Sequence, residues 1–145
     1  MSKKIGIAND HAGTVYKFEI IKLLENKGFE VINYGTDTEE SMDYTDTIHQ
    51  LGHAIDTGAI PRGIILCGSG NGAAITANKH QKVRAVLCWS EELVKLGRAH
   101  NDANVLSIPA RFVSLYQALN FVELFLDTSF DGGRHQRRVE KIPLK

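Results

Sequence analysis

A cysteine at the end of an apolar run stands beside a glycine-rich loop. Residues 64–66 lead into Cys67, and glycines follow at positions 68, 70 and 72. Glycines let the backbone approach a ligand closely, and the N–H groups of such a loop and of the following helix point at negative charge. The same N–H groups and the helix dipole lower the pKa of a nearby thiol from its ordinary ~8.5. The sequence therefore predicts an anion-binding loop with a thiolate-like Cys67 that can act as a base or a nucleophile.

Other known loop chemistries fit this segment less well. A phosphatase loop of the Cys-x5-Arg type needs an arginine where the chain has Ala73, and the Gly-Lys-Ser/Thr ending of a Walker loop is absent. The dinucleotide fingerprint G-x-G-x-x-G/A is met by Gly68, Gly70 and Ala73, with Glu91 about 20 residues further on. That match follows the third predicted strand instead of the first. A nucleotide-binding Rossmann-like domain therefore stays open as an alternative from a different class of function.

Two further polar clusters are placed by their order relative to the strands. Asp10 and His11 follow the first predicted strand, whereas His100, Asn101 and Asp102 precede the fifth. The two ends of a parallel sheet lie at opposite edges, so one pocket can contain both clusters only if a second subunit presents His100 across an interface. This order predicts a dimer with shared sites.

The remaining candidate ligands do not form a recognisable metal motif. No pair of His or Cys has zinc-ligand spacing inside a recognisable motif, and Cys67 and Cys88 end two different strands, so we expect no metal. The run that contains Arg134, Arg137 and Arg138 is read most simply as a solvated helix face. Arg134 and Arg138 are nevertheless i, i+4 neighbours that can grip one phosphate together.

The elements that must position these residues alternate between short apolar runs and segments of helical period, which predicts βαβ units. We expect an α/β, three-layer Rossmann-like fold, with a five-stranded parallel sheet and helices on both faces, in a single domain over 1–145. In the first helix, Val15, Phe18, Ile21 and Leu24 are expected on the buried face. The basic tail over 131–145 is expected to form a turn and a short helix that packs at a dimer interface. The predicted strands cover 4–8, 29–33, 63–66, 85–88 and 104–108, and the predicted helices cover 14–27, 44–57, 91–98, 114–126 and a segment from 71 onward.

Composition excludes several classes of function. The 145 residues are 43% hydrophobic, with 17 Lys+Arg against 17 Asp+Glu, so the chain lacks the basic footprint of a protein that binds nucleic acid non-specifically. Only two cysteines are present, and no apolar run approaches the ~18 residues that span a bilayer. We therefore expect a cytoplasmic protein with no membrane partner.

Five segments are spread over nearly the whole chain: "NDHAG", "DYTD", "CGSGNGAAITANK", "RAHNDANVL" and "GGRHQRRV". Together they resemble the type B ribose-5-phosphate isomerases. This family also includes allose-6-phosphate isomerases and the subunits of galactose-6-phosphate isomerase. The resemblance implies aldose–ketose isomerisation of a sugar phosphate, ribose 5-phosphate to ribulose 5-phosphate, with a six-carbon sugar phosphate as the alternative substrate. It also implies a homodimer, or a tetramer, with no cofactor.

The resemblance further implies roles for individual residues. The Cys67 thiolate would remove the proton from sugar C2, and Ser69 would help to move hydrogen between the two oxygens of the cis-enediolate. Asp10 with His100 would open the furanose ring beforehand. Some members have a glutamate base at the position of Ala73 here, so the chain falls in the cysteine-base group. The substrate-binding set implied is His11, Tyr44, Gly68, Gly70, Asn71, Gly72, Asn101, Arg111, Arg134 and Arg138.

A third class is a catalytically silent partner subunit, because related chains assemble together in the galactose-6-phosphate branch. Every catalytic position that the resemblance implies is filled in this chain, which favours a self-sufficient enzyme.

Overall fold

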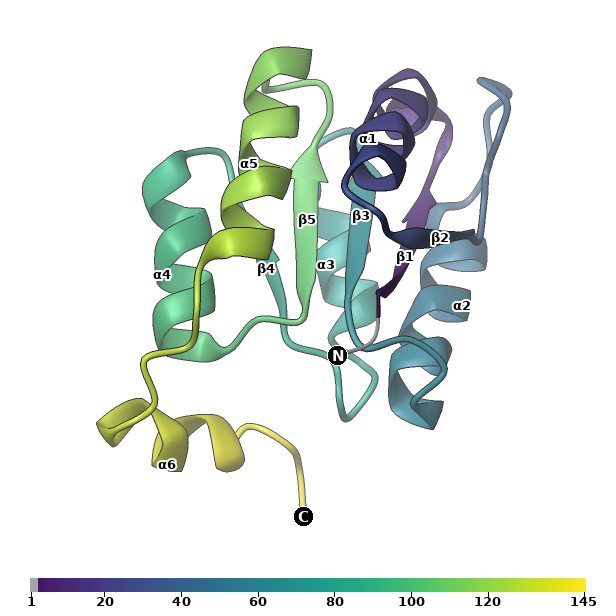
Figure 1. The fold of residues 1–145 in the computed structure, drawn as a ribbon. Helices are drawn as coiled ribbons and strands as arrows, with labels where there is room; N and C mark the ends of the chain where they lie inside the picture. Colours follow the sequence, from purple (N-terminus) through teal and green to yellow (C-terminus); the bar gives the residue numbers. More distant parts are fainter. Residues whose placement is uncertain (1–2) are drawn as a thin grey trace.

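A computed structural model describes residues 3–145 of the chain. Within these residues, five parallel strands form one sheet in the order β2-β1-β3-β5-β4 (Figure 1), with helices packed on both faces. This confirms the predicted α/β fold class. The strands are β1 (Lys4–Asn9), β2 (Glu30–Asn33), β3 (Gly63–Cys67), β4 (Ala85–Leu87) and β5 (Val105–Pro109).

The helices confirm the predicted order and differ from it mainly at their ends. The fourth one runs to Asn101, three residues beyond its predicted end, so that His100 lies in its last turn. The tail contributes the short sixth helix. The helices are α1 (Thr14–Asn26), α2 (Tyr44–Thr57), α3 (Asn71–Ala77), α4 (Glu91–Asn101), α5 (Leu115–Asp127) and α6 (Arg134–Glu140), and a 3-10 turn η1 (His11–Gly13) precedes the first of them.

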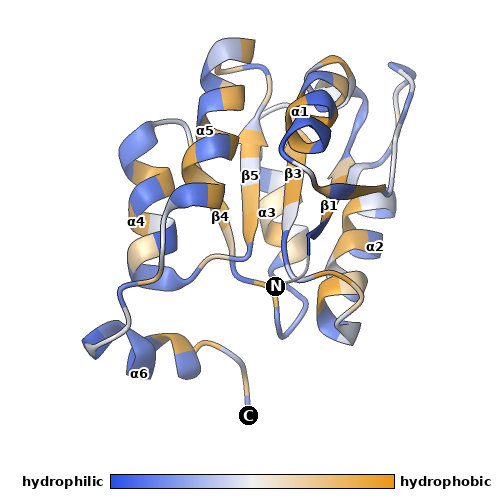
Figure 2. Ribbon diagram, in the orientation of Figure 1, coloured by the Kyte–Doolittle hydropathy of each residue, from blue (hydrophilic) through white to orange (hydrophobic). Residues whose placement is uncertain are grey.

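The central strand β3 shows how the sheet divides two cores. All five of its residues are buried, as expected for a parallel strand covered on both faces. Ile64 and Leu66 join the apolar cluster under α1, α4 and α5, whereas Ile65 and Cys67 join the one under α2 and α3. Figure 2 shows the apolar central strands between these helices. The side chain of Cys67 therefore lies on the α2–α3 face of the sheet.

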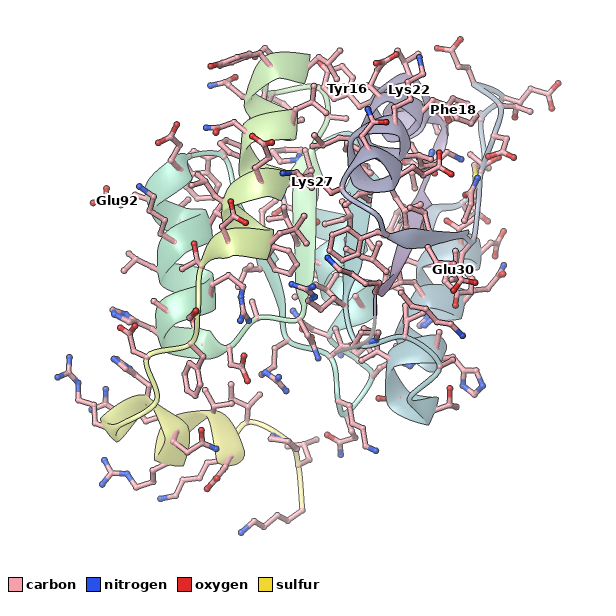
Figure 3. All side chains as sticks on the ribbon, in the orientation of Figure 1. Tyr16, Phe18, Lys22, Lys27, Glu30 and Glu92 are labelled. Carbon is pink, nitrogen blue, oxygen red and sulfur yellow. The ribbon has the colours of Figure 1, made fainter. Side chains whose placement is uncertain are left out.

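The predicted buried face of α1 is partly wrong. Val15 and Phe18 are 56% and 42% exposed, and Figure 3 shows Phe18 at the outside of the molecule. Leu24 is buried and Ile21 partly buried, as predicted, but Lys17 and Ile20 face inward in place of Val15 and Phe18. The physical reason is that the Lys17 ammonium finds oxygen partners in the segment after β2, so this charged side chain is buried and the helix is rotated accordingly.

The C-terminal segment lies at the amino edge of the sheet. Figure 1 shows α6 at the end of the sheet opposite the arrowheads of the strands. Asp131 N–H donates to the carbonyl of Ala99 at 2.9 Å, and Gln81 makes two hydrogen bonds with the backbone of Leu144. These contacts hold the tail against its own chain. Among the residues described, no helix is both long and apolar enough to cross a membrane.

Candidate active site

The carboxyl ends of β1 and β3 meet in the middle of the sheet, where the chain reverses its direction of winding. Asn9 of β1 lies in register with Leu66 of β3, and the Asp10 N–H donates to the Leu66 carbonyl at 3.1 Å. Open α/β sheets bind ligands in the crevice at such a switch point. The two sequence segments predicted at this edge, Asp10–His11 and the glycine loop after Cys67, are therefore neighbours.

Three backbone N–H groups surround the Cys67 sulfur. The N–H groups of Gly70, Gly72 and Ala73, at the start of α3, hydrogen-bond to it and favour the thiolate. Burial opposes them, since only 4% of Cys67 is exposed, and the Asp10 carboxylate acts in the same direction as burial. The net effect raises the pKa of the Cys67 thiol above its ordinary value. The prediction of a lowered pKa was wrong because it counted the N–H donors and the helix dipole but not the desolvation of the sulfur.

The glycine loop has a fixed shape that depends on Gly70. Its φ is +77°, in the left-handed region, and a Cβ there would lie 2.4 Å from a methyl carbon of Leu87 and 3.2 Å from the backbone nitrogen of Pro109. The Gly70 carbonyl accepts a hydrogen bond from the Ser107 hydroxyl at 2.8 Å. The loop is thus held before any ligand arrives, with its N–H groups already directed at one place.

Ser69, Asn71, Tyr44 and Arg111 surround this loop. Ser69 Oγ accepts a hydrogen bond from the Asn71 N–H at 3.3 Å, and the Arg111 N–H donates to the Gly68 carbonyl at 3.0 Å. Tyr44, the first residue of α2, covers Gly72: a Cβ at that position would lie 2.5 Å from a ring carbon of the tyrosine. A Cβ on Gly68 would lie 3.4 Å from Arg111 Nη1. The loop therefore lies between an aromatic ring and a guanidinium of the same chain.

Asp10 and His11 follow β1 at the same edge of the sheet as the glycine loop. Asp10 is 7% exposed, and its carboxylate accepts a hydrogen bond from the Ala12 N–H at 2.9 Å, which caps η1. His11 Nδ1 accepts a hydrogen bond from the Met42 N–H at 3.2 Å. Both side chains are thus held by backbone groups at the edge where Cys67 ends β3.

The other predicted residues lie at the opposite edge of the sheet. His100 and Asn101 are the last residues of α4, which leads into the start of β5. There the backbone of Asn104 hydrogen-bonds to Arg84 and Gly63, at the beginnings of β4 and β3, so this end of α4 lies at the amino edge of the sheet. Arg134 and Arg138 belong to α6, which packs on α4 at this amino edge. Within one chain, the structure brings ten predicted site residues to the carboxyl edge and leaves these four apart: His100, Asn101, Arg134 and Arg138.

His135 is a neighbour of this second group that the sequence analysis did not single out. Its ring stacks on that of His100, with centroids 4.2 Å apart and an interplanar angle of 13°. Its place between Arg134 and Arg138 is visible in the sequence, but the contact with His100 depends on how the tail folds back. Partial desolvation, followed by the charges of His100, Arg134 and Arg138, lowers the pKa of His135.

This amino-edge cluster suits an anion better than a metal cation. His100, Asp131 and His135 have candidate ligand atoms within 4.8 Å of one another. The two imidazole rings are nearly parallel, however, so their in-plane lone pairs run side by side instead of converging on one point. Arg134 and Arg138 flank His135 in the sequence and disfavour a cation.

A cysteine and a glycine loop of fixed shape lie at the switch point of a Rossmann-like sheet, which is an arrangement typical of α/β enzymes. Comparison with known proteins then gives the family. The sequence model of the Ribose/Galactose Isomerase family matches residues 5–142, and the chain belongs to this family. The resemblance read from the five sequence segments is thereby confirmed, and the match favours an isomerase over the nucleotide-binding alternative.

Individual relatives agree over nearly the full length. The chain is 42% identical to ribose-5-phosphate isomerase B of Escherichia coli (strain K12) over 140 residues, which covers 97% of this chain and 94% of that protein. The crystal structure of a ribose 5-phosphate isomerase from Thermotoga maritima superposes with a TM-score of 0.93 at 43% identity, covering 97% of both chains. Ribose-5-phosphate isomerase B from Mycoplasma genitalium, solved with bound ribulose-5-phosphate, gives a TM-score of 0.92 at 38% identity, with 96% of this chain and 93% of that one covered.

Proposed function

We propose that this enzyme interconverts ribose 5-phosphate and ribulose 5-phosphate, with Cys67 as the base. The observation that carries the proposal is the position of the Cys67 sulfur at the switch point, where the backbone N–H groups of Gly70, Gly72 and Ala73 donate to it. A base and an oxyanion site are thus combined at one position. The names of the relatives support this substrate, and one of them was solved with bound ribulose-5-phosphate.

The reaction moves one proton between adjacent carbons and needs no cofactor. After ring opening, the Cys67 thiolate takes the proton from C2, the electron pair of that C–H bond forms the C1–C2 double bond, and the C1 carbonyl oxygen becomes negatively charged. The backbone N–H groups of the loop from Gly68 to Gly72 stabilise this cis-enediolate. Ser69 passes hydrogen from the C2 oxygen to the C1 oxygen, and return of the proton to C1 gives the ketose. A general base contributes about 10²–10⁴-fold to such a rate, and one oxyanion donor about 10²–10³-fold.

Ring opening and phosphate binding require groups from both edges of the sheet. In the proposed mechanism Asp10 and His100 open the furanose by acid–base catalysis, and Asn101 holds the intermediate. Since these residues lie at opposite edges of one chain, we propose a homodimer in which each site combines the carboxyl edge of one subunit with the amino edge of the other. A tetramer can be built from such dimers.

The basic residues divide in the same way. His11 and Arg111 come from the subunit that supplies Cys67, and Arg134 and Arg138 come from its partner, so the phosphate is gripped across the interface. Tyr44 lies against the sugar. The tail over 131–145 then packs at the dimer interface, and the whole chain acts as one domain. Two free cysteines without a disulfide support a location in the reducing cytoplasm.

The proposal is tested by assaying the purified chain alone on ribose 5-phosphate, allose 6-phosphate and galactose 6-phosphate. Cys67→Ala should lower kcat at least about 10²-fold with KM little changed, because the base acts on the transition state. Cys88→Ala is the matched control, since Cys88 is also buried and directly follows β4. Full turnover by Cys67→Ala would refute the base. Conversion of a six-carbon substrate alone would favour the alternative substrate, and no conversion would favour a silent partner subunit.

A further inference from the structure

Lys17 is a fully buried charge that the proposed reaction does not use. Its side chain has no exposed surface, and its ammonium donates to the Thr36 carbonyl, to Asp37 Oδ1 at 2.5 Å and to Asn33 Oδ1 at 3.3 Å. A buried ammonium is tolerated only when such partners compensate for its lost hydration. The Lys17 ammonium, followed by the Asn33 amide, in turn holds the pKa of Asp37 below its ordinary value. Lys17 and the segment after β2 are therefore coupled.

This segment, residues 36–42, is irregular but anchored along its first part. The Thr36 N–H donates to the Asn9 carbonyl at 3.0 Å, and the Thr14 hydroxyl donates to the Thr38 carbonyl at 2.7 Å. The Asn33 amide donates to Asp37 Oδ1 at 2.8 Å. Lys17 and Asp37 are the two charged side chains among these contacts. The anchors thus tie segment 36–42 to β1 and α1, the two elements on either side of Asp10 and His11 in the chain.

The other end of segment 36–42 fixes His11. The Met42 N–H donates to His11 Nδ1 at 3.2 Å. A neutral imidazole has one acceptor and one donor nitrogen, so an Nδ1 that accepts a hydrogen bond leaves the proton on Nε2. His11 then offers an Nε2–H donor, which is the form that can bind a phosphate oxygen.

We propose that Lys17 is a positioning residue for substrate binding: by anchoring segment 36–42, it holds the Met42 N–H on His11 Nδ1 and keeps His11 in the Nε2–H tautomer. The proposal rests on the proposed function, in which His11 binds the substrate phosphate. Lys17 touches neither the substrate nor the reacting atoms. Its effect is therefore expected in binding and not in the proton-transfer step.

Two variants test the two ends of this connection. Lys17→Met keeps the length of the side chain and removes its charge, and the Asp37 carboxylate that it releases is 62% exposed and can be solvated. Met42→Pro removes the backbone N–H that donates to His11 Nδ1. Each should raise KM for ribose 5-phosphate about tenfold, the value of one hydrogen bond to a charged ligand, with kcat within about twofold of wild type. Lys22→Met, on the exposed side of the same helix, is the matched control and should change neither constant.

The tautomer is measured independently of activity by ¹⁵N NMR of the imidazole nitrogens, with the His11 signals assigned from a His11→Gln variant. The wild type should show Nε2–H, and both variants should show a mixture of tautomers. An Nδ1–H tautomer in the wild type, or an unchanged tautomer and KM in Lys17→Met, would overturn the proposal. A fall in kcat with unchanged KM would also overturn it, since it would make Lys17 merely structural.

Two further results keep the test decisive. If Lys17→Met does not fold, Asp37→Ala weakens the same anchor from an exposed position, and an unchanged KM and tautomer in that variant would contradict the proposal. If the wild type converts no sugar phosphate, the proposed function fails, whereas the NMR comparison still decides whether Lys17 controls His11.

Discussion

Two inactive variants should regain activity when they share a dimer, because Cys67 and His100 lie at opposite edges of one chain. In a two-fold symmetric dimer, each site takes Cys67 from one subunit and His100 from the other. A dimer of one Cys67→Ala subunit and one His100→Ala subunit therefore has one site with both substitutions and one site with neither. The intact site should turn over at the wild-type rate.

The size of the effect follows from the same geometry. Random assembly of equal amounts of the two chains gives about half mixed dimers, each with one intact site of two, so about a quarter of wild-type activity should return. The assay is co-expression of the two variants with different affinity tags, followed by measurement of turnover for the mixture and for the separated mixed dimers, which should reach about half of wild type.

A same-edge pair provides the control. Cys67→Ala combined with Asp10→Asn leaves no site intact, because both residues belong to the subunit that supplies the glycine loop, so this mixture should give only the average of its parents. Isolated mixed dimers of Cys67→Ala and His100→Ala without restored activity would refute the division of the site between the two edges. Restoration by the same-edge pair would refute it equally.

The pH dependence and the loop geometry give two more expectations. Burial, the largest effect, and Asp10 raise the pKa of Cys67, and only the deprotonated sulfur accepts the C2 proton, so kcat/KM should climb with pH up to an apparent pKa above the ordinary thiol value of about 8.5; a titration with an apparent pKa below neutrality would contradict this. Gly70→Ala and Gly58→Ala both force alanine to a φ near that of the left-handed region, +77° and +80°, at a cost of about 1–2 kcal/mol of folding free energy each. Only Gly70→Ala also clashes with Leu87, so only it should lower kcat, and equal kinetics for the two variants would show that the loop shape is not required.

The fold and the carboxyl-edge site could be predicted because their signals are local in the sequence. Apolar runs alternate with segments of helical period, and Cys67 ends a continuous apolar strand with the glycines directly after it. The position of His100 at the other edge followed from its order alone, since it precedes a strand while Cys67 ends one.

Other features depend on contacts between distant residues and have no local signal. The inward face of α1 depends on Lys17 meeting Asp37, 20 residues away, and hydropathy alone places a lysine outside. The stacking of His135 on His100 depends on the return of the tail. The direction of the pKa shift of Cys67 depends on how deeply its sulfur is buried, and the sequence motif does not show this.

The protected sulfur also bears on the resistance of this enzyme to oxidants. Peroxide attacks the thiolate and not the thiol, and sulfenic acid formation follows exposure and thiolate character. Because Cys67 is 4% exposed and burial raises its pKa, we expect peroxide to oxidise it more slowly than an exposed cysteine. The burial that makes the cysteine a weaker acid between turnovers thus preserves it for the next one.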